Sequence, residues 1–189
     1  MASTVDSAAA AGPVPGAPAV ALRLVATVDE EGPAGGTVPT TRRVDFLVAA
    51  ETSVAVEEGR STSFPTARLW PEVRDRLPDL PHLRADPRGR PAPPPREPGE
   101  GFVEACRAYV VLATVVTDGG PLAPDSTPAD AGVVGVRTWL ATDDELWSTT
   151  ARADGTTDVR PAAEGAVGDL VLWDVTAAFE ALVRLAEQP

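Results

Sequence analysis

The sequence predicts an α+β protein: an antiparallel sheet built from two β-hairpin/β-β-β-α units, with the helices on one face. Several short segments alternate apolar and polar residues, which predicts strands. The turns Glu51-Thr52 and Asp143-Asp144 divide these segments into hairpins. An apolar stripe near residue 180 predicts a closing helix. With 189 residues, 43% of them hydrophobic, the chain is long enough for one compact domain.

The first half begins with residues 1–18, which are rich in Pro, Gly and Ala and predict a disordered tail. Residues 19–29 alternate cleanly and predict a half-buried strand. The breaker-rich segment 30–41 predicts a long loop. Residues 42–59 predict a β-hairpin, and "RSTSF" at 60–64 predicts a short third strand.

A short helix follows in "PTARLWPEVRDRLP", where Pro71 suits a first helical turn and Trp70 lies on the apolar side. It closes the first unit, residues 19–77. Residues 78–99 are rich in Pro and Arg, which predicts an extended surface linker without regular helix. The second unit is expected over 100–189.

The start of the second unit has two interpretations. Phe102, Cys106, Tyr109, Val110 and Ala113 are spaced as one helical stripe. The β-branched run "YVVLATVVT" equally favours a strand. We favour a helix that converts to a strand near Tyr109.

The rest of the second unit predicts strands at 132–142, in "ELWSTTARA" and in "TTDVRPA", with a hairpin turn at Asp154-Gly155. Residues 168–175 predict either a fourth strand or the start of a helix. Thr176 is expected to cap a terminal helix whose stripe is Val175, Phe179, Leu182, Val183 and Ala186.

An internal echo links the two halves. Aligning 44–56 with 136–148 matches apolar or small residues at four positions, the pairs Leu47/Trp139, Val48/Leu140, Ala49/Ala141 and Val54/Leu146. The two units are therefore expected to pair about a pseudo-twofold axis. The alternative is that two hairpins of one biased composition resemble each other by chance.

The charge is unevenly spread. The net charge is −12, with about −10 in residues 100–189 and −2 in residues 1–99. An acidic chain repels phosphate backbones, which disfavours nucleic acid as a partner. Residues 68–96 are the basic exception, with seven arginines against four acids. We expect this basic stretch to lie back across the acidic half and fasten it.

The composition also indicates in which cellular compartment the protein is expected. The single cysteine, Cys106, excludes a disulfide framework within the chain and fits a reducing cytoplasm. The N-terminus has no uninterrupted apolar segment typical of a secretory signal, and the most apolar run, 108–117, is too short to cross a bilayer. Neither export nor a membrane partner is expected. The absence of Lys, Asn and Ile is typical of a GC-rich genome such as an actinobacterial one.

Little in the sequence indicates catalysis. The only histidine, His82, lies in the linker, where nothing is expected to hold it at the precision that catalysis needs. Cys106 lies on the apolar stripe and is expected to be an inert buried thiol. The acidic run at residues 143–145 does not have the spacing of a calcium loop. We therefore predict no catalytic, cofactor-binding or metal-binding residues.

Four tryptophans, Trp70, Trp139, Trp147 and Trp173, are many for a chain with four Phe and one Tyr. Core packing is one interpretation. The other is an exposed aromatic patch that anchors a protein partner. On that hypothesis the partner-binding residues are Trp70, Trp139, Trp147, Asp143 and Asp144.

The segment "WLATDDELWSTTARADGTTDVRPA" (139–162) and the helix after it resemble the C-terminal sheet unit of the ESX (type VII) secretion-associated chaperones of actinobacteria. Asp143, Trp147, Asp154, Pro161 and a helix at 176–187 stand where that family has an aromatic hairpin, a strand ending in Pro and a closing helix. Asp144-Glu145 replaces the family's usual Gly-Arg, and the chain is shorter than a typical member. The resemblance implies two quasi-related halves and a non-enzymatic protein that binds secreted, helical partners.

Three functions follow as expectations. The first is a non-catalytic cytoplasmic protein-binding adaptor or chaperone, associated with secretion. The second is a small-ligand-binding or enzymatic α+β domain with a pocket near Cys106, Tyr109 and an acid. The third is a structural subunit of a larger assembly.

Overall fold

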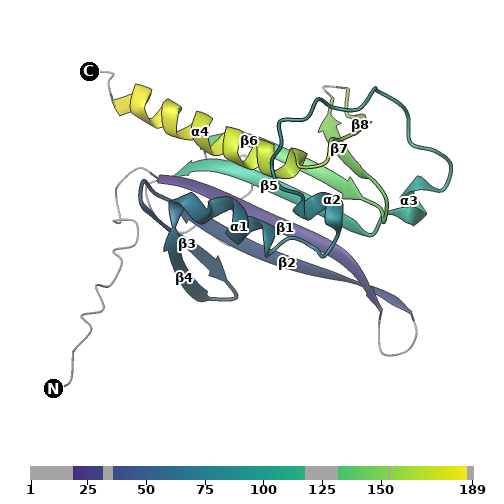
Figure 1. The fold of residues 1–189 in the computed structure, drawn as a ribbon, viewed down its shortest axis with the longest axis horizontal. Helices are drawn as coiled ribbons and strands as arrows, with labels where there is room; N and C mark the ends of the chain where they lie inside the picture. Colours follow the sequence, from purple (N-terminus) through teal and green to yellow (C-terminus); the bar gives the residue numbers. More distant parts are fainter. Residues whose placement is uncertain (1–18, 32–35, 118–131, 153, 187–189) are drawn as a thin grey trace.

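The computed structural model describes residues 19–31, 36–117, 132–152 and 154–186, so the tail expected over 1–18 lies outside the described residues. The described chain forms one eight-stranded sheet in the order β4-β3-β2-β1-β5-β6-β7-β8 (Figure 1). Every neighbouring pair is antiparallel, which confirms the predicted α+β class. The strands are β1 (Ala19–Glu31), β2 (Thr37–Val48), β3 (Thr52–Glu57), β4 (Arg60–Pro65), β5 (Ala108–Thr117), β6 (Gly132–Ala141), β7 (Leu146–Ala151) and β8 (Thr157–Pro161).

The strand order contains two consecutive four-stranded meanders, β1 to β4 and β5 to β8. They meet where β1 pairs with β5, from Ala19 opposite Thr117 to Val28 opposite Ala108. The first strands of the two meanders therefore lie at the centre of the sheet, and the last strands form its edges.

The loop predicted over 30–41 is wrong for the residues that the structure describes there, which are strand apart from Gly36. β1 continues to Glu31 and β2 begins at Thr37, with Thr37 opposite Glu31 and Pro39 opposite Asp29. A proline is tolerated in a strand where its missing N–H is not needed by a neighbour. Here β2 pairs with β3 only from Asp45 to Leu47, so the pairing of these two strands does not extend to Pro39.

The predicted echo is out of register by one residue. It aligns Leu47 with Trp139, but Phe46 is the β2 residue that shares the core with Trp139. Successive residues of a strand face opposite sides of a sheet, so a shift of one residue exchanges the two faces.

The favoured conversion from helix to strand near Tyr109 is confirmed, because β5 begins at Ala108, but the helix does not follow the apolar stripe as far as Ala113. A one-turn helix, α3 (Phe102–Ala105), precedes β5. The β-branched run is paired on both sides, by β1 and by β6, and this pairing outweighs the helical spacing of the stripe. Tyr109 consequently points away from the core and is exposed.

The strand alternative for 168–175 is wrong, and the helix alternative is right. α4 (Ala166–Ala186) is a single helix that begins directly after Gly165. Thr176 is therefore inside the helix and does not cap it, and its hydroxyl donates to the Leu172 carbonyl at 2.8 Å. α4 carries one continuous buried side, formed by Val167, Val171, Val175 and Ala178.

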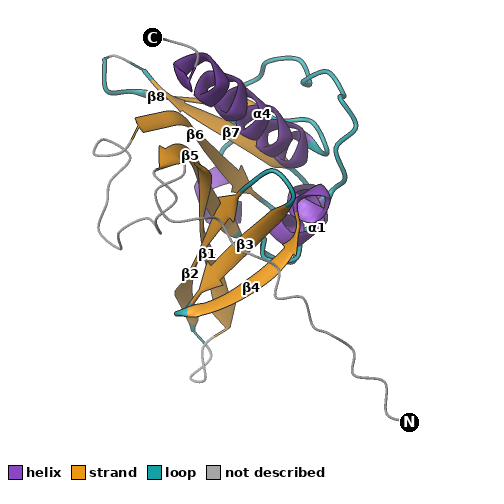
Figure 2. Ribbon diagram, turned by 90° about the vertical axis from the view of Figure 1, so that its left-hand side faces the viewer, coloured by secondary structure: helices purple, strands orange, loops and turns teal. Residues whose placement is uncertain are grey.

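Three helical segments contribute to one core. α1 (Leu69–Arg74), α2 (Pro81–Arg84) and α4 all bury residues in the cluster that contains Leu22, Phe46 and Trp139, and Figure 2 shows α1 and α4 on the same side of the sheet. α1 follows a single 3-10 turn at Thr66–Arg68. α3 is apart from this cluster, because its Phe102 packs on Trp147 at 5.1 Å between ring centres.

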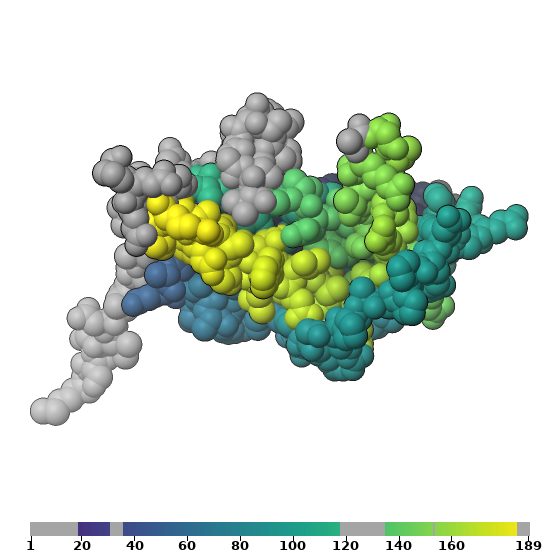
Figure 3. Space-filling model, turned by 90° about the horizontal axis from the view of Figure 1, so that it is seen from above, coloured from purple at the N-terminus to yellow at the C-terminus, as the bar shows by residue number. Residues whose placement is uncertain are grey.

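The linker predicted to lack regular helix contains α2. Pro81 occupies the first turn, where a missing N–H costs nothing, and Leu83 is buried. The extended part that follows, residues 85–99, is called the strap below. It runs beside the N-terminal end of α4 (Figure 3).

The strap is fastened to the acidic second half, as expected. Arg90 lies 2.8 Å and Arg88 3.8 Å from the Glu164 carboxylate. The backbone N–H of Gly89 donates to the Asp169 carboxylate at 3.0 Å. Further along, Arg96 pairs with Glu145.

Two glycines allow the strap to approach α4 closely. A Cβ on Gly168 would lie 2.7 Å from Cγ of Pro87 and 3.0 Å from the Trp70 ring. Gly165 has a φ of 87°, and a Cβ there would collide with the Asp86 carbonyl oxygen. Alternating ion pairs and close backbone packing therefore hold the strap in place.

Candidate binding groove

A groove of about 980 Å³ lies on the core side of β1 to β4. It lies where β2 separates from β3 and where the segment between α1 and α2 passes over the sheet. The lining residues are Ala26, Val28, Asp29, Glu30, Thr40, Thr41, Arg42, Ala55, Glu57, Glu58, Arg60, Thr62, Arg76, Leu77, Pro78, Asp79, Leu80, Arg84, Arg107 and Asp143.

The floor of the groove is apolar and its rim is charged. Val28 and Leu80 are partly buried against the core, and Ala55 is itself a member of the core cluster. Around this floor stand arginines and carboxylates of both signs. An apolar floor with polar groups at the rim is the usual composition of a binding site.

The rim is crossed by an ion pair at the point where the sheet splits. The Arg42 guanidinium donates to the Glu57 carboxylate, joining β2 to β3 just beyond their last paired residues. This hydrogen bond is the main cause that lowers the pKa of Glu57 and raises the pKa of Arg42.

Arg76 stands between the groove and the core. It donates to Glu72 at 2.9 Å and lies 3.8 Å from Glu57. Its guanidinium also lies 5.5 Å from the centre of the Phe46 ring. Its Nε is buried and has no hydrogen-bond partner among the described residues, and it is the atom that faces the Glu57 carboxylate in the ion pair.

The opposite wall is held by Arg84. Its guanidinium donates to the Leu77 carbonyl at 2.6 and 3.1 Å and to Asp79 at 2.8 Å. These contacts fix the turn between α1 and α2 in an otherwise irregular segment. At the far end, Arg107 pairs with Asp143 at 3.2 Å.

The two acidic residues predicted to bind a partner lie in different hollows. Asp143 lines the groove, whereas Asp144 lines a second hollow of about 150 Å³ under the strap. His82 and Glu145 also line this smaller hollow.

The predicted aromatic patch is wrong for the three tryptophans assigned to it. Trp139 and Trp147 are each 1% exposed, and Trp70 is buried as well. Their positions explain this: Trp70 and Trp139 face the core, and Trp147 is covered by Phe102 and by the Arg96 guanidinium, 4.8 Å from its ring centre. Core packing, the other interpretation, describes them correctly.

Trp173, left out of the predicted site, is the exposed tryptophan. It is 69% exposed on the outer side of α4, next to the exposed Leu172. The signal was present in the spacing, because Trp173 falls between Val171 and Val175 of the buried stripe and so points away from it. This spacing has that meaning only in a helix, and the sequence left residues 168–175 open to a strand as well.

The residues considered for chemistry are not brought together. Burial raises the pKa of the Cys106 thiol, which disfavours the reactive thiolate. Neither hollow described above has Cys106 or Tyr109 in its lining. Within the described ranges, no three His, Cys, Asp or Glu side chains form a group that could hold a metal ion. Nor does any helix of those ranges have the length and apolarity to cross a bilayer.

Comparisons with protein-family models, with curated proteins and with solved structures find no match to this chain.

Proposed function

We propose that this protein is a non-catalytic protein-binding adaptor or chaperone whose groove receives an extended segment of its partner. The observation that carries the proposal is the groove itself: an apolar floor at Val28 and Leu80, beside a strand edge of β2 that has no neighbour in the described sheet. Extended segments bind beside a strand edge by pairing their backbone with it and by placing alternate side chains in pockets.

The rim suits a segment with charged residues of both signs. The Arg42–Glu57 and Arg107–Asp143 pairs are partly exposed, so each partner can exchange its ion pair for one with the bound segment at small cost.

The narrower proposal is a cytoplasmic chaperone associated with type VII secretion, which binds a secreted helical substrate. Its support is the resemblance over 139–187. The side-by-side meanders are compatible with two pseudo-twofold units once the alignment is moved by one residue, so that Phe46 corresponds to Trp139.

A small-ligand or enzymatic function is the second candidate. The volume of the groove, about 980 Å³, is in the range of pockets that hold small molecules. A structural subunit of a larger assembly is the third proposal, for which the exposed Trp173 offers a contact.

Site-specific photocrosslinking in the native host tests the main proposal. A photoreactive residue at Thr40, on the groove rim, is expected to give a protein adduct, and Val28→Arg in the same chain is expected to abolish it. The matched control carries the photoreactive residue at Thr150, which is exposed on β7 far from the groove lining. Equal adducts at both positions, or an adduct that survives Val28→Arg, would contradict the proposal. Small-molecule binding that Val28→Arg removes, without any protein adduct, would favour the second candidate.

A further inference from the structure

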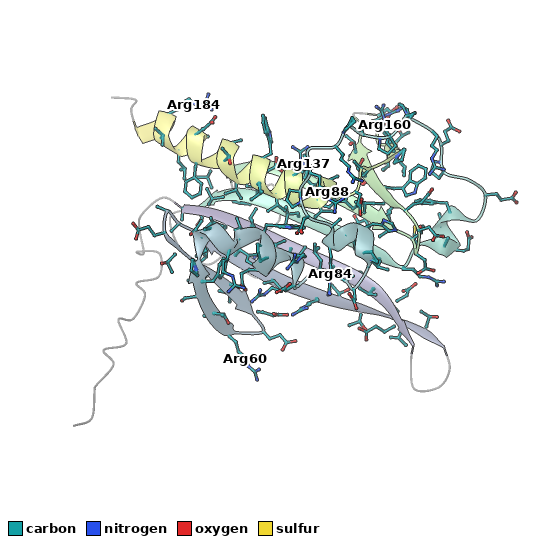
Figure 4. The ribbon with its side chains drawn as sticks, viewed as in Figure 1. Arg60, Arg84, Arg88, Arg137, Arg160 and Arg184 are labelled. Carbon is teal, nitrogen blue, oxygen red and sulfur yellow. The ribbon has the colours of Figure 1, made fainter. Side chains whose placement is uncertain are left out.

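The two edges of the sheet differ in how open they are to another strand. An edge strand exposes unpaired N–H and C=O groups and is a template for strand addition unless it is guarded. Apart from the part of β2 beside the groove, the edges of the described sheet are β4 and β8, which lie at opposite ends of the strand order. Figure 4 shows Arg60 of β4 and Arg160 of β8 on opposite sides of the molecule.

The direction of the backbone groups in β4 follows from two contacts. The Thr66 N–H donates inward to the Glu51 carbonyl at 2.9 Å, and Pro65, which has no N–H, is opposite Thr52. Because the groups alternate along a strand, the N–H and C=O of Ser61 and Ser63 point outward. β4 therefore offers two donors and two acceptors on its outer edge.

These outward groups are arranged symmetrically about Thr62. If a second β4 runs antiparallel with Thr62 opposite Thr62, then Ser61 lies opposite Ser63 and Ser63 opposite Ser61. Both serine pairs are then hydrogen-bonded pairs, and the same surface serves both copies, as a twofold axis requires.

The side chains of β4 do not oppose such pairing. Ser61, Thr62 and Ser63 are small, polar and exposed. The only charge is Arg60, which would lie opposite Phe64 of the second copy and not opposite its own counterpart. In a chain of net charge −12, an edge with no carboxylate is a place where two copies meet with little repulsion.

The β8 edge is less suited to the same role. Its outward positions include Pro161, which has no N–H to donate. Pro93 and Arg96 of the strap share a small hollow with Pro161, so the strap lies beside this end of the strand. The carboxylate of Asp158 is already occupied by Arg152 and Arg160, at 3.2 and 2.7 Å.

We propose that the protein forms a twofold-symmetric homodimer through its β4 strands, which joins two eight-stranded sheets into one continuous sheet. The twofold axis stands perpendicular to the sheet at Thr62. Both binding grooves then open on the same face of the dimer, on either side of the seam. This proposal is independent of what the groove binds.

The test is the mass of the full chain in solution, measured by light scattering and sedimentation over a concentration series. The unaltered protein is expected to reach twice the monomer mass. Ser63→Pro removes an outward N–H without touching the β3 ladder, and is expected to give a monomer. Val159→Pro makes the matched change on the β8 edge and is expected to remain a dimer. A protein that stays monomeric throughout, or a dimer that Val159→Pro dissolves and Ser63→Pro does not, would overturn the proposal.

If Ser63→Pro does not fold, a pair of charged substitutions at Thr62, on the twofold axis, tests the same interface. Thr62→Glu and Thr62→Arg each place like charges directly opposite one another and are expected to be monomeric alone. Mixing the two proteins places Glu opposite Arg and is expected to restore a mixed dimer. This outcome depends on the self-opposition of Thr62, so a mixture that stays monomeric while the unaltered protein dimerises would reject the register.

Discussion

Asp174 on α4 accepts two parallel hydrogen bonds from the Arg137 guanidinium on β6, at 2.9 and 3.0 Å. Asp174 is 4% exposed, whereas the Arg137 side chain is 40% exposed. The pair is the main cause that raises the pKa of Arg137. It links the closing helix to the second meander.

Removal of the arginine alone is expected to be costly. In Arg137→Ala the carboxylate of Asp174 stays buried without its partner, which should lower the free energy of unfolding by about 2–4 kcal/mol. Urea denaturation measures this. The control is Arg137→Ala combined with Asp174→Ala, in which no charge is left unpaired. A double variant less stable than the single one would contradict the explanation.

The strap is expected to come loose when α4 can no longer be approached closely. A Cβ in Gly168→Ala would meet Pro87 and the Trp70 ring, so the strap must move outward. Limited proteolysis should then cut within residues 84–96 several times faster than in the unaltered protein. Gly36→Ala is the matched control, because a Cβ at Gly36 meets nothing within 4 Å. Equal cleavage rates in both variants would show that the strap does not depend on Gly168.

High salt is expected to loosen the strap only in part. The Arg88 and Arg90 pairs with Glu164 are partly exposed, and exposed ion pairs are screened by salt. The close contact of Pro87 with Gly168 of α4 is not an ion pair, so salt does not screen it. Cleavage in 84–96 should therefore rise modestly between low and high salt, and less than in Gly168→Ala. The same cleavage rate at both salt concentrations would show that these ion pairs do not hold the strap in place.

Truncation of two tryptophans should lower the stability by very different amounts. Trp139→Ala removes a fully buried ring from the core and is expected to cost about 3–5 kcal/mol of stability. Trp173→Ala removes an exposed ring and is expected to change stability by about 0.5 kcal/mol or less. Thermal unfolding of both variants decides this. A large loss for Trp173→Ala would place that ring in a contact that the described residues do not show.

The Arg42–Glu57 pair predicts a pH dependence. Because the pKa of Glu57 is lowered in the folded protein, its stabilisation is complete above about pH 4.5 and is lost as the pH falls through the folded value. Arg42→Gln should thus cost about 0.5 kcal/mol near pH 7 and close to nothing in acid. Urea midpoints at both pH values measure the difference. Arg60→Gln is the control with the same change in charge, and it should show no such convergence.

The strands of the first meander were predictable because each depends on local alternation and on short turns. The 19–29 strand, the 42–59 hairpin and "RSTSF" all appear as strands. The segment 102–117 was predictable in part: the change from helix to strand near Tyr109 was expected, but helical spacing and β-branched composition disagreed over how far each element extends. What decides it is pairing with β1, about 80 residues earlier in the chain, and a local pattern does not contain that partner.

The candidate site was largely hidden from the sequence. Of the residues expected to bind a partner, only Asp143 lines the groove, and the three tryptophans are buried. The groove walls come from residues 26–30, 40–42, 55–62 and 76–84 together with Arg107. No spacing in the sequence indicates that these segments lie around one groove. They do so because β2 separates from β3 in the folded sheet. The fastening of the strap was predictable, because opposite charge is visible in composition.

The central position of β1 has a consequence for synthesis on the ribosome. β1 acquires β2 almost at once, but Val28 meets Ala108 only after 80 further residues have been added. Until then the backbone N–H and C=O groups on that edge of β1 are open to any other extended chain. Long-range strand pairing of this kind folds slowly. The length of the connection between the meanders therefore sets how long the nascent chain needs protection, and shortening the strap would reduce that interval.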